Sequence, residues 1–333
     1  MKVLLAAPHI NQERGNAVTV RRIMLGLEQL NVESEILSTT EKNSSKFMPP
    51  VDLIHGFHAR RFQEFVNVLK QPIGLYVITM TGTDLNHDLF EKAGRDLVLE
   101  CTANASAIHV FNHEAKSILV NADHRLYSKI HVIHQGTDLL PVTKSNRGEI
   151  RPFTFFLPAG MRKVKNIPAA IHMLLKLRLH GYDFNLLLAG PILEEAEGKT
   201  ILELVQRNYD WIHYAGAVAH VEMGRLYEKA DVVLNSSITE GQPAAILEGM
   251  QAELPVLVSG NNGNRSIVKH NENGLIYETE CQFLNYAEQL LLDAPLRKRL
   301  SIAASQFIKK QHSSTHEANA LLDLYKTILH AKK

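Results

Sequence analysis

Features that define several protein classes are scarce or missing in this sequence. Its 333 residues include only two cysteines, Cys101 and Cys281, and no C-x-x-C pair. This usage excludes a disulfide-stapled scaffold and a zinc ribbon, and it favours a reducing compartment, so we expect a cytoplasmic protein. No apolar run approaches the roughly 18 residues of a membrane span. The short apolar run at residues 2–7 is typical of a first strand rather than of a signal peptide.

A charge excess is missing as well. The 36 basic and 35 acidic residues leave a net charge of +1, which provides no field for wrapping nucleic acid. We therefore expect no nucleic-acid partner, whereas peripheral contact with a membrane and the oligomeric state stay open. Hydrophobic residues make up 45% of the chain and charged residues 21%, as in ordinary globular proteins, and the length suits two domains of about 150 residues each.

Short apolar runs alternate with helical patterns along the whole chain. The runs are nearly continuous hydrophobics, which is typical of parallel strands covered on both faces. In the first half they fall at residues 2–7, 32–37, 52–55, 73–79, 106–111 and 130–134, and in the second half at 153–158, 184–189, 211–214, 231–235, 255–259 and 274–277. Six strand–helix units on each side of a break predict an α/β chain with two doubly wound domains.

The break falls at residues 139–152, a polar segment with glycine, proline and no periodicity. We predict a first domain over residues 1–145, a second over 146–312, and a last helix over 313–333. In the second domain Pro168 suits a first helical turn, and Gly181 suits the position where that helix stops.

A basic loop directly follows the first strand of the second half. Gly160 is followed by Arg162, Lys163 and Lys165, just before a predicted helix. Cations at a helix N-terminus oppose the helix dipole, so they destabilise the loop unless an anion is bound. The loop therefore indicates a diphosphate site, and a solvated basic turn is the alternative.

A second loop follows the predicted strand at residues 231–235. Pro243 suits a first helical position, so Gly241 and Gln242 would approach a helix N-terminus, where free N–H groups face a ligand. Glu248 lies about a turn and a half beyond that helix start, where a carboxylate can accept both hydroxyls of a ribose. The alternative is that Glu240 and Glu248 merely favour the helix dipole.

Weaker signals follow strands of the first half. Gly15 and Asn16 stand before the first helix, where a glycine admits a phosphate or sugar, although no G-x-G-x-x-G motif is present and a simple turn is the alternative. His55, His58 and Asp84 should face a cleft, where a polar side chain can orient an acceptor or accept its proton. Ordinary loop polarity is the alternative. No ligand pattern indicates a metal site.

These motifs resemble those of family 4 glycosyltransferases of the GT-B type. Two glutamates with seven residues between them form the family signature, and Glu240 and Glu248 have that spacing. The surroundings are similar too: Gly190, Gly216, Gly263, Asn264 and a hinge-like segment at residues 132–138. The donor-phosphate cations of the family correspond to Arg162 and Lys165, which stand three apart rather than five, so Lys163 remains an alternative to Lys165.

Shorter segments of the sequence resemble particular groups within these glycosyltransferases. Residues 15–19 and 235–250 look most like the glycosyltransferase 1 domain-containing family, whereas residues 58–61 and 81–85 look more like selenosugar synthases. The resemblance implies two Rossmann-like domains facing each other across a cleft, with the last helix crossing back to the first domain.

The implied function is retaining transfer of a sugar from a nucleoside-diphosphate sugar, a UDP-sugar, to an unknown acceptor bound by the N-terminal domain. Arg162 and Lys165 would stabilise the leaving diphosphate, Glu248 would hold the ribose, and Glu240 would hold the sugar or the nearby ribose. Backbone around the remaining donor-site residues would complete the site: Gly15, Asn16, Gly160, Gly190, Gly216, Gly241, Gln242 and Pro243. His58 and Asp84 are the candidate acceptor-side catalytic residues. No Asp-x-Asp motif is present, so we expect no metal cofactor. A selenosugar or thiosugar synthase, a sugar-nucleotide epimerase and a non-catalytic binding module remain alternatives.

Overall fold

A computed structural model of the chain describes residues 1–11, 15–41, 48–137 and 151–331. The chain divides into two compact units, each considered by itself below. Unit 1 consists of Met1–Gly136 and Gln311–Lys333, and unit 2 consists of Thr137–Lys310. The predicted boundary at residue 145 lies outside the described residues.

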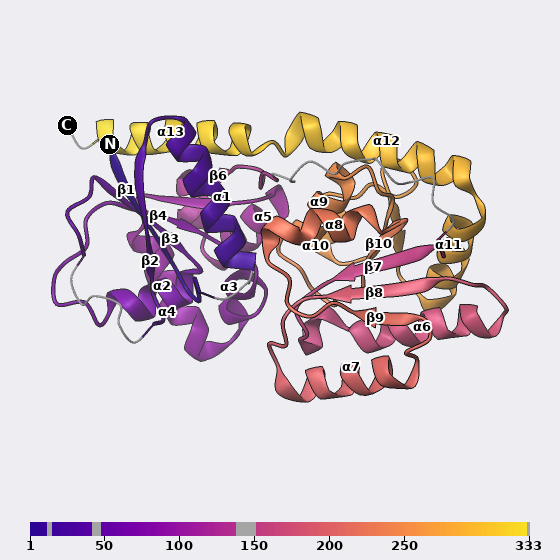
Figure 1. Ribbon diagram of the computed structural model, residues 1–333. Coiled ribbons are helices and arrows are strands. Elements are labelled where there is room, and N and C mark those ends of the chain that lie inside the picture. The colour runs from indigo at the N-terminus through magenta and orange to yellow at the C-terminus, as the bar shows by residue number, and fades with distance from the viewer. Residues whose placement is uncertain (12–14, 42–47, 138–150, 332–333) are drawn as a thin grey trace. The chain divides into compact units, whose positions relative to one another are not determined.

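Each unit is built on one parallel sheet of six strands (Figure 1). Unit 1 has the order β2-β1-β3-β4-β5-β6, with β1 (Lys2–Ala7), β2 (Glu33–Ser38), β3 (Leu53–Phe57), β4 (Tyr76–Thr79), β5 (Ala107–Val110) and β6 (Ile130–Val132). Unit 2 has the order β12-β11-β10-β7-β8-β9, with β7 (Thr154–Pro158), β8 (Asn185–Ala189), β9 (Ile212–Tyr214), β10 (Val232–Asn235), β11 (Val256–Ser259) and β12 (Leu275–Tyr277). All the strands predicted from the apolar runs are confirmed.

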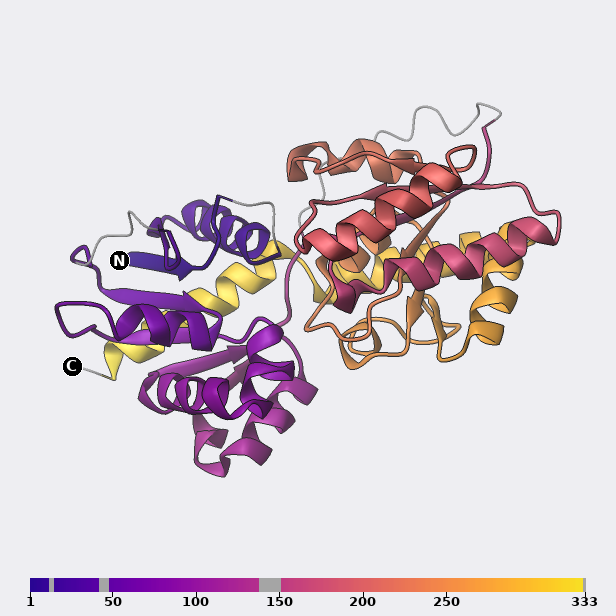
Figure 2. The ribbon, with the colours of Figure 1, turned by 90° about the horizontal axis from the view of Figure 1, so that it is seen from below.

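Helices connect the strands and cover both faces of each sheet, as the second view also shows (Figure 2). In unit 1 they are α1 (Gly15–Gln29), α2 (Ala59–Val66), α3 (Thr83–Asn86), α4 (Lys92–Asn104), α5 (His113–Ala122) and α13 (Ser314–His330). In unit 2 they are α6 (Ile167–Leu179), α7 (Glu195–Arg207), α8 (Met223–Glu228), α9 (Ala244–Gln251), α10 (Asn262–Arg265), α11 (Glu280–Leu292) and α12 (Ala294–Gln311), which ends at the limit between the units.

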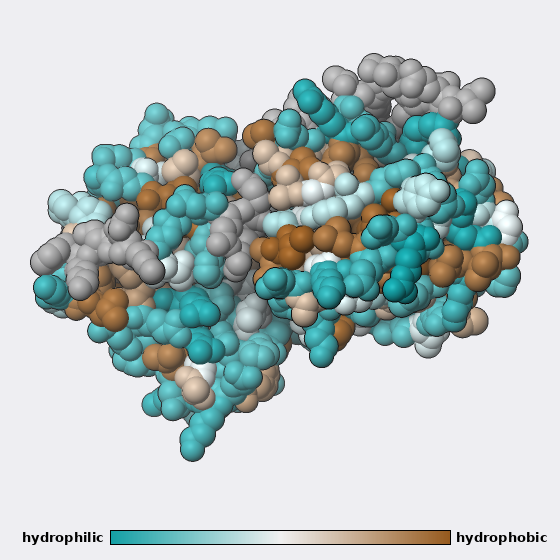
Figure 3. Space-filling view, turned by 60° about the horizontal axis from the view of Figure 1, so that its bottom comes forward, coloured by the Kyte–Doolittle hydropathy of each residue, from teal (hydrophilic) through white to brown (hydrophobic). Residues whose placement is uncertain are grey.

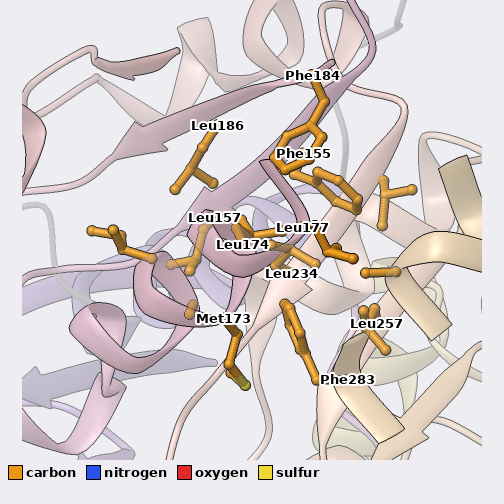
Figure 4. Close-up of a cluster of buried hydrophobic side chains, with 14 of the residues drawn as sticks. Phe155, Leu157, Met173, Leu174, Leu177, Phe184, Leu186, Leu234, Leu257 and Phe283 are labelled. Carbon is orange, nitrogen blue, oxygen red and sulfur yellow. The ribbon is translucent and has the colours of Figure 1, made fainter. Parts of the chain in front are cut away.

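Successive strand residues pack on opposite faces of each sheet, because side chains alternate along a strand. In unit 1, Val3 and Leu5 join a buried cluster with α1 and α13, whereas Leu4 joins the cluster under α2, α4 and α5. In unit 2, Phe155 packs with α6 and α11 (Figure 4), whereas Phe156 packs with α8 and α9. Each such buried side chain contributes about 1.5–3 kcal/mol, so both faces need their helices.

Local signals set the limits of α6 as predicted. Pro168 occupies the first turn of the helix, and the chain leaves the helix through Gly181, whose φ is +91°. A left-handed backbone of this kind favours glycine, because a Cβ would be strained there. This helix carries the basic loop at its start and therefore positions that loop beside the sheet.

The outer surface is mostly polar. On the face that Figure 3 shows, hydrophilic residues cover most of the surface and hydrophobic residues form small patches. Among the described residues, none of the helices combines the length and the apolar character that crossing a membrane requires.

Candidate active site

The strand order of unit 2 places its candidate site. The chain runs from β7 to β8 and β9 in one direction and from β10 to β11 and β12 in the other, so β7 and β10 are neighbours where the order reverses. In open parallel sheets, ligands bind beyond the carboxyl ends of the strands at such a reversal. The loops after β7 and after β10 meet there, and they are the two loops that the sequence singles out.

Lys165 and Glu240 form an ion pair between these loops. The Lys165 Nζ atom donates to Glu240 Oε1 at 2.6 Å, and the two side chains are only 17% and 10% exposed. The same oxygen accepts a hydrogen bond from Ser237 Oγ at 2.6 Å and one from Asn235 Nδ2 at 3.1 Å. Burial alone would raise the pKa of Glu240, but the Lys165 charge and these donors outweigh it, so the pKa is lowered. Glu240 is therefore an ionised, nearly buried carboxylate.

This pair corrects one expectation about the basic loop. Lys165 was expected to lie in an unfavourable position until a ligand anion arrives. In the structure Glu240 supplies that anion, because the short 3-10 turn Lys163–Lys165 directs the Lys165 side chain toward the loop after β10. Two further bonds hold the loops together: Ile238 N donates to Val164 O at 2.8 Å, and Ser236 Oγ donates to Lys165 O at 2.8 Å.

Arg162 and Lys163 differ from Lys165 in their surroundings. The Nε atom of Arg162 is buried and has no hydrogen-bond partner among the residues that the structure describes. A buried donor without a partner is rare in native proteins and calls for an explanation such as a missing ligand. Lys163 is exposed, and its backbone N–H donates to Glu194 Oε2 at 2.8 Å. The structure thus brings Lys165, and not Lys163, to Glu240.

Glu248 lies on α9 and is only 6% exposed. Its Oε2 accepts a hydrogen bond from the Tyr227 hydroxyl at 2.7 Å, and its Oε1 lies 2.9 Å from His220 Nε2. Burial raises the pKa of Tyr227, and the Glu248 charge raises it further, so the hydroxyl stays protonated and donates. His220 and Tyr227 were not found from the sequence, because nothing in their spacing connects them to Glu248. The sequence signal that points to them is their position after β9, because ligands bind beyond the carboxyl ends of such strands.

Several glycines of the site are required by close packing. Gly190 has φ +146°, and a Cβ there would stand 2.2 Å from Ala159 O, because the loops after β7 and β8 touch. Its N–H donates to Gly216 O at 2.8 Å. A Cβ on Gly263 would stand 2.6 Å from the Cβ and from the carbonyl oxygen of Glu240. Gly160 is less constrained, because a Cβ there would meet the end of the flexible Leu193 side chain, which can move.

The approach to α9 differs slightly from expectation. The helix starts at Ala244, so Pro243 is the residue that caps the helix rather than its first helical residue. With φ −77° and ψ 102°, Pro243 is extended, and the chain enters the helix one residue later. Gly241 and Gln242 still precede the helix N-terminus, and Gln242 is 9% exposed.

In unit 1 the corresponding reversal lies between β1 and β3, and His58 directly follows β3. Its backbone has φ 68°, which is strained for a residue with a side chain. The ring is 12% exposed, its Nε2 lies 3.9 Å from Asp88 Oδ2, and its buried Nδ1 has no hydrogen-bond partner among the described residues. Strain together with an unpaired buried polar atom is typical of functional sites.

The expectation that the Asp84 side chain faces a cleft is wrong. Asp84 is fully buried, and its carboxylate accepts backbone N–H groups from its own turn and from the start of α2, where Ala59 N lies 2.9 Å from Oδ2. The short helix α3 turns the side chain inward, where it fixes the residue next to His58.

Gly15 starts α1, and a Cβ there would meet nothing within 4 Å, while Asn16 is half-buried. Residues 12–14 of the loop before Gly15 lie outside the described residues.

The expectation that His55 faces a cleft is wrong as well. His55 lies inside β3, is fully buried, and takes part in a chain of hydrogen bonds that starts at the Tyr325 hydroxyl on α13. His55 Nε2 lies 2.5 Å from Thr79 Oγ1, Thr79 Oγ1 lies 2.8 Å from His109 Nδ1, and His109 Nε2 lies 2.9 Å from Ile133 O. Burial lowers the pKa of both histidines, so both rings are neutral.

Comparison with known proteins defines the class of this chain. Residues 144–307 match the family described as "Glycosyl transferases group 1". The two six-stranded parallel sheets match solved glycosyltransferases of the GT-B fold over nearly the whole chain. The chain therefore carries a glycosyltransferase group 1 domain and is a transferase enzyme with two Rossmann-like domains. This confirms the family resemblance and the fold class predicted from the sequence.

Individual relatives are more distant. The chain is 26% identical to glycosyltransferase 1 domain-containing protein 1 of Xenopus tropicalis over 261 residues, 74% of each chain. It is 29% identical to the putative glycosyltransferase EpsD of Bacillus subtilis, over 52% of this chain and 47% of that one. Among solved structures, HepE of Anabaena in complex with UDP and glucose has a TM-score of 0.79 at 15% identity, covering 98% of this chain and all of that one. Sucrose-phosphate synthase of Thermosynechococcus elongatus has a TM-score of 0.83 at 16% identity, covering 99% and 100%.

Proposed function

We propose that this chain is a retaining hexosyltransferase whose donor is a nucleoside-diphosphate sugar, held by unit 2. The observation that carries the proposal is the Lys165–Glu240 pair at the reversal between β7 and β10, with Arg162 in the same loop as Lys165 and its buried Nε lacking an acceptor among the described residues. Two cations and a carboxylate at that edge of the sheet match the charges and hydroxyls of a sugar diphosphate. UDP is the proposed nucleotide because the structurally similar HepE was solved with UDP-glucose.

The ion pair suggests how the donor binds. In the structure Lys165 is neutralised by Glu240, so a diphosphate must take over the Lys165 ammonium group. Glu240 Oε1 then becomes available to accept hydroxyls of the sugar. The buried Arg162 Nε gains the acceptor that it lacks. Both cations would stabilise the negative charge that grows on the leaving diphosphate, which is how such groups accelerate transfer without a metal.

The remaining residues complete the proposal. Glu248 holds the ribose, sharing its oxygens with Tyr227 and His220 or displacing His220, whose side chain is 34% exposed. The backbones of the donor-site glycines approach the diphosphate. On the acceptor side we retain His58 as the residue that touches the acceptor, whereas Asp84 positions it by holding the start of α2. We also keep the cytoplasm as the proposed location, supported by the two free cysteines.

Calorimetry with UDP, GDP and ADP, followed by an assay of sugar release from the corresponding donor, tests the proposal. We expect UDP to bind, and Arg162→Ala to lower turnover by on the order of 10²–10³, as for other groups that stabilise developing charge. Arg178→Ala is the matched control, because Arg178 pairs with Asp183 elsewhere in unit 2. If none of the three nucleotides binds, or if both variants turn over alike, the proposed donor site is wrong.

A further inference from the structure

A polar pocket of about 570 Å³ lies in unit 2, apart from the residues proposed to bind the donor. One wall is a face of α6 that carries Ala169 and His172, and the other walls are the residues that follow β10, β11 and β12. None of the residues around this pocket is Arg162, Lys165, Glu240 or Glu248. Its size suits a small-molecule ligand, and it opens at the carboxyl ends of parallel strands, where α/β sheets bind ligands.

The charges around this pocket cancel. Lys176 of α6 is paired with Glu280 at the start of α11, and Glu278 is paired with Arg265. With its one lining lysine paired to a carboxylate, the pocket does not suit a phosphate. With both lining carboxylates paired to cations, it does not suit a metal ion either. The ligand that fits should therefore carry no net charge.

Apart from the apolar Ala169, Met173 and Ile238 and from Gly260, the remaining lining groups are uncharged donors and acceptors. They are hydroxyls and carboxamides, together with the rings of Tyr277 and His172, and the polar ones are Asn166, Ser236, Ser237, Ser259, Asn261 and Thr279. The hydroxyls of Ser236, Ser237 and Ser259 already donate within the protein, so toward a ligand their oxygens are acceptors. Groups of this kind satisfy a ligand that presents many hydroxyls of its own. A neutral saccharide combines those hydroxyls with an apolar ring face that can lie on an aromatic side chain.

The pocket is one hydrogen bond away from the ion pair of the donor site. Ser237 lines the pocket, and its Oγ donates to Glu240 Oε1 at 2.6 Å. The Ser237 carbonyl in turn accepts from Ser259 Oγ at 2.6 Å and from Asn261 Nδ2 at 2.9 Å, and both of these residues also line the pocket. A ligand that bonds to Ser259 or Asn261 therefore competes for the bonds that hold Ser237 against Glu240.

We propose that this pocket is a second saccharide site, whose neutral sugar ligand changes donor affinity through Ser237 and Glu240. The coupling rests on the proposed function of the donor site, whereas the binding of a saccharide to the pocket does not. The concentration of free saccharide would then control how easily the Lys165–Glu240 pair breaks. It would thereby control how tightly Lys165 binds the donor diphosphate.

Saturation-transfer NMR with glucose, maltose and N-acetylglucosamine tests the site, each at about 10 mM to suit millimolar dissociation constants. We expect at least one sugar to give a signal with the parent protein. Ala169→Trp should abolish that signal by filling the pocket. His172→Ala should reduce the signal without disturbing folding, because His172 is exposed. Ala196→Trp on the exposed face of α7 is the matched control and should leave the signal unchanged.

The results that overturn the proposal are distinct from those that overturn the donor site. No signal from any of the three sugars, or a signal that survives both pocket variants, overturns the second site. A signal that Lys165→Ala abolishes while Ala169→Trp leaves it intact places the sugar in the donor site and overturns the second site as well. UDP affinity should change by about fivefold or more when the sugar is added, and an unchanged affinity overturns the coupling. Failure of UDP to bind at all overturns the donor site instead.

Discussion

Replacing Lys165 by alanine should lower both the stability and the turnover of the protein. The change removes the Lys165 charge from Glu240, which is 10% exposed and ionised, while Ser237 and Asn235 still donate to its Oε1. Breaking a fully buried ion pair by removing one partner costs about 3–5 kcal/mol. Because Lys165 keeps 17% of its surface in water, we expect a smaller loss, of about 2–3 kcal/mol.

Thermal unfolding measures this loss directly. For a domain the size of unit 2, each kcal/mol shifts Tm by about 2–4 °C, so Tm should fall by about 4–12 °C. The double variant Lys165→Ala with Glu240→Gln should recover part of the loss, since the buried carboxylate charge is removed together with the lysine. A Tm equal to that of the parent would refute this reasoning. It would show that the unfavourable interaction of Lys165 with the helix dipole cancels the stability that its pair with Glu240 provides.

Turnover separates a catalytic role of Lys165 from a structural one. If Lys165 stabilises the leaving diphosphate, turnover should fall by on the order of 10²–10³, more than donor affinity falls, at a temperature where the variant stays folded. Lys163→Ala is the matched control, because Lys163 is exposed in the same loop. A loss of turnover in Lys163→Ala alone would move the diphosphate site to Lys163. Normal turnover in both variants would refute the role of this loop.

Three further predictions concern other parts of the molecule. Glu248→Ala should weaken UDP binding by roughly 1.5–3 kcal/mol in calorimetry, the usual worth of hydrogen bonds to a charged group, and an unchanged affinity would remove Glu248 from the ribose site. Turnover should survive EDTA, because cationic side chains replace a metal on the diphosphate, and a complete loss that Mg²⁺ reverses would contradict this. Burial holds the pKa of His55 and His109 below 6.5 and lowers that of His312 to about 4. The unfolded chain therefore binds protons that the folded chain does not, and stability should fall as the pH drops below 6.5, by up to about 1.4 kcal/mol per pH unit for each histidine. Urea unfolding between pH 7 and pH 5 measures the slope, and a flat profile would show that these rings are protonated in the folded state.

The sequence predicted the sheets well because parallel strands have a strong local signal. A strand covered on both faces must be hydrophobic along its length, so runs such as Lys2–Ala7 were found within a few residues of their limits. The signals that set the ends of α6 are also local, because Pro168 and Gly181 act through their own backbone geometry. These features depend on a few neighbouring residues and can be read without knowing the rest of the fold.

The candidate site was predicted less completely, because its contacts join residues far apart in the chain. The sequence indicates the basic loop and the two glutamates, but Lys165 and Glu240 stand 75 positions apart, so their pairing has no local signal. Because of that pairing, Lys165 stabilises the loop instead of destabilising it as expected. The direction in which Asp84 points depends on the start of α2, 25 positions away. His220 is likewise a site residue only because the fold brings it within hydrogen-bond distance of Glu248.

The hydrogen-bonded chain through His55 has a consequence for the docking of α13. The Ile133 carbonyl can only accept, so His109 must carry its proton on Nε2 and accept on Nδ1 from the Thr79 hydroxyl. Thr79 then accepts from His55 Nε2, and His55 Nδ1 is left needing a donor, which the Tyr325 hydroxyl provides. Apolar contact alone would let a leucine-rich helix slide by one turn along the sheet at little cost. Such a slide would withdraw the hydroxyl and leave a buried ring nitrogen without a donor. This chain of hydrogen bonds therefore acts together with the buried pair of Arg22 on α1 and Glu317 on α13 to specify a single alignment of the last helix.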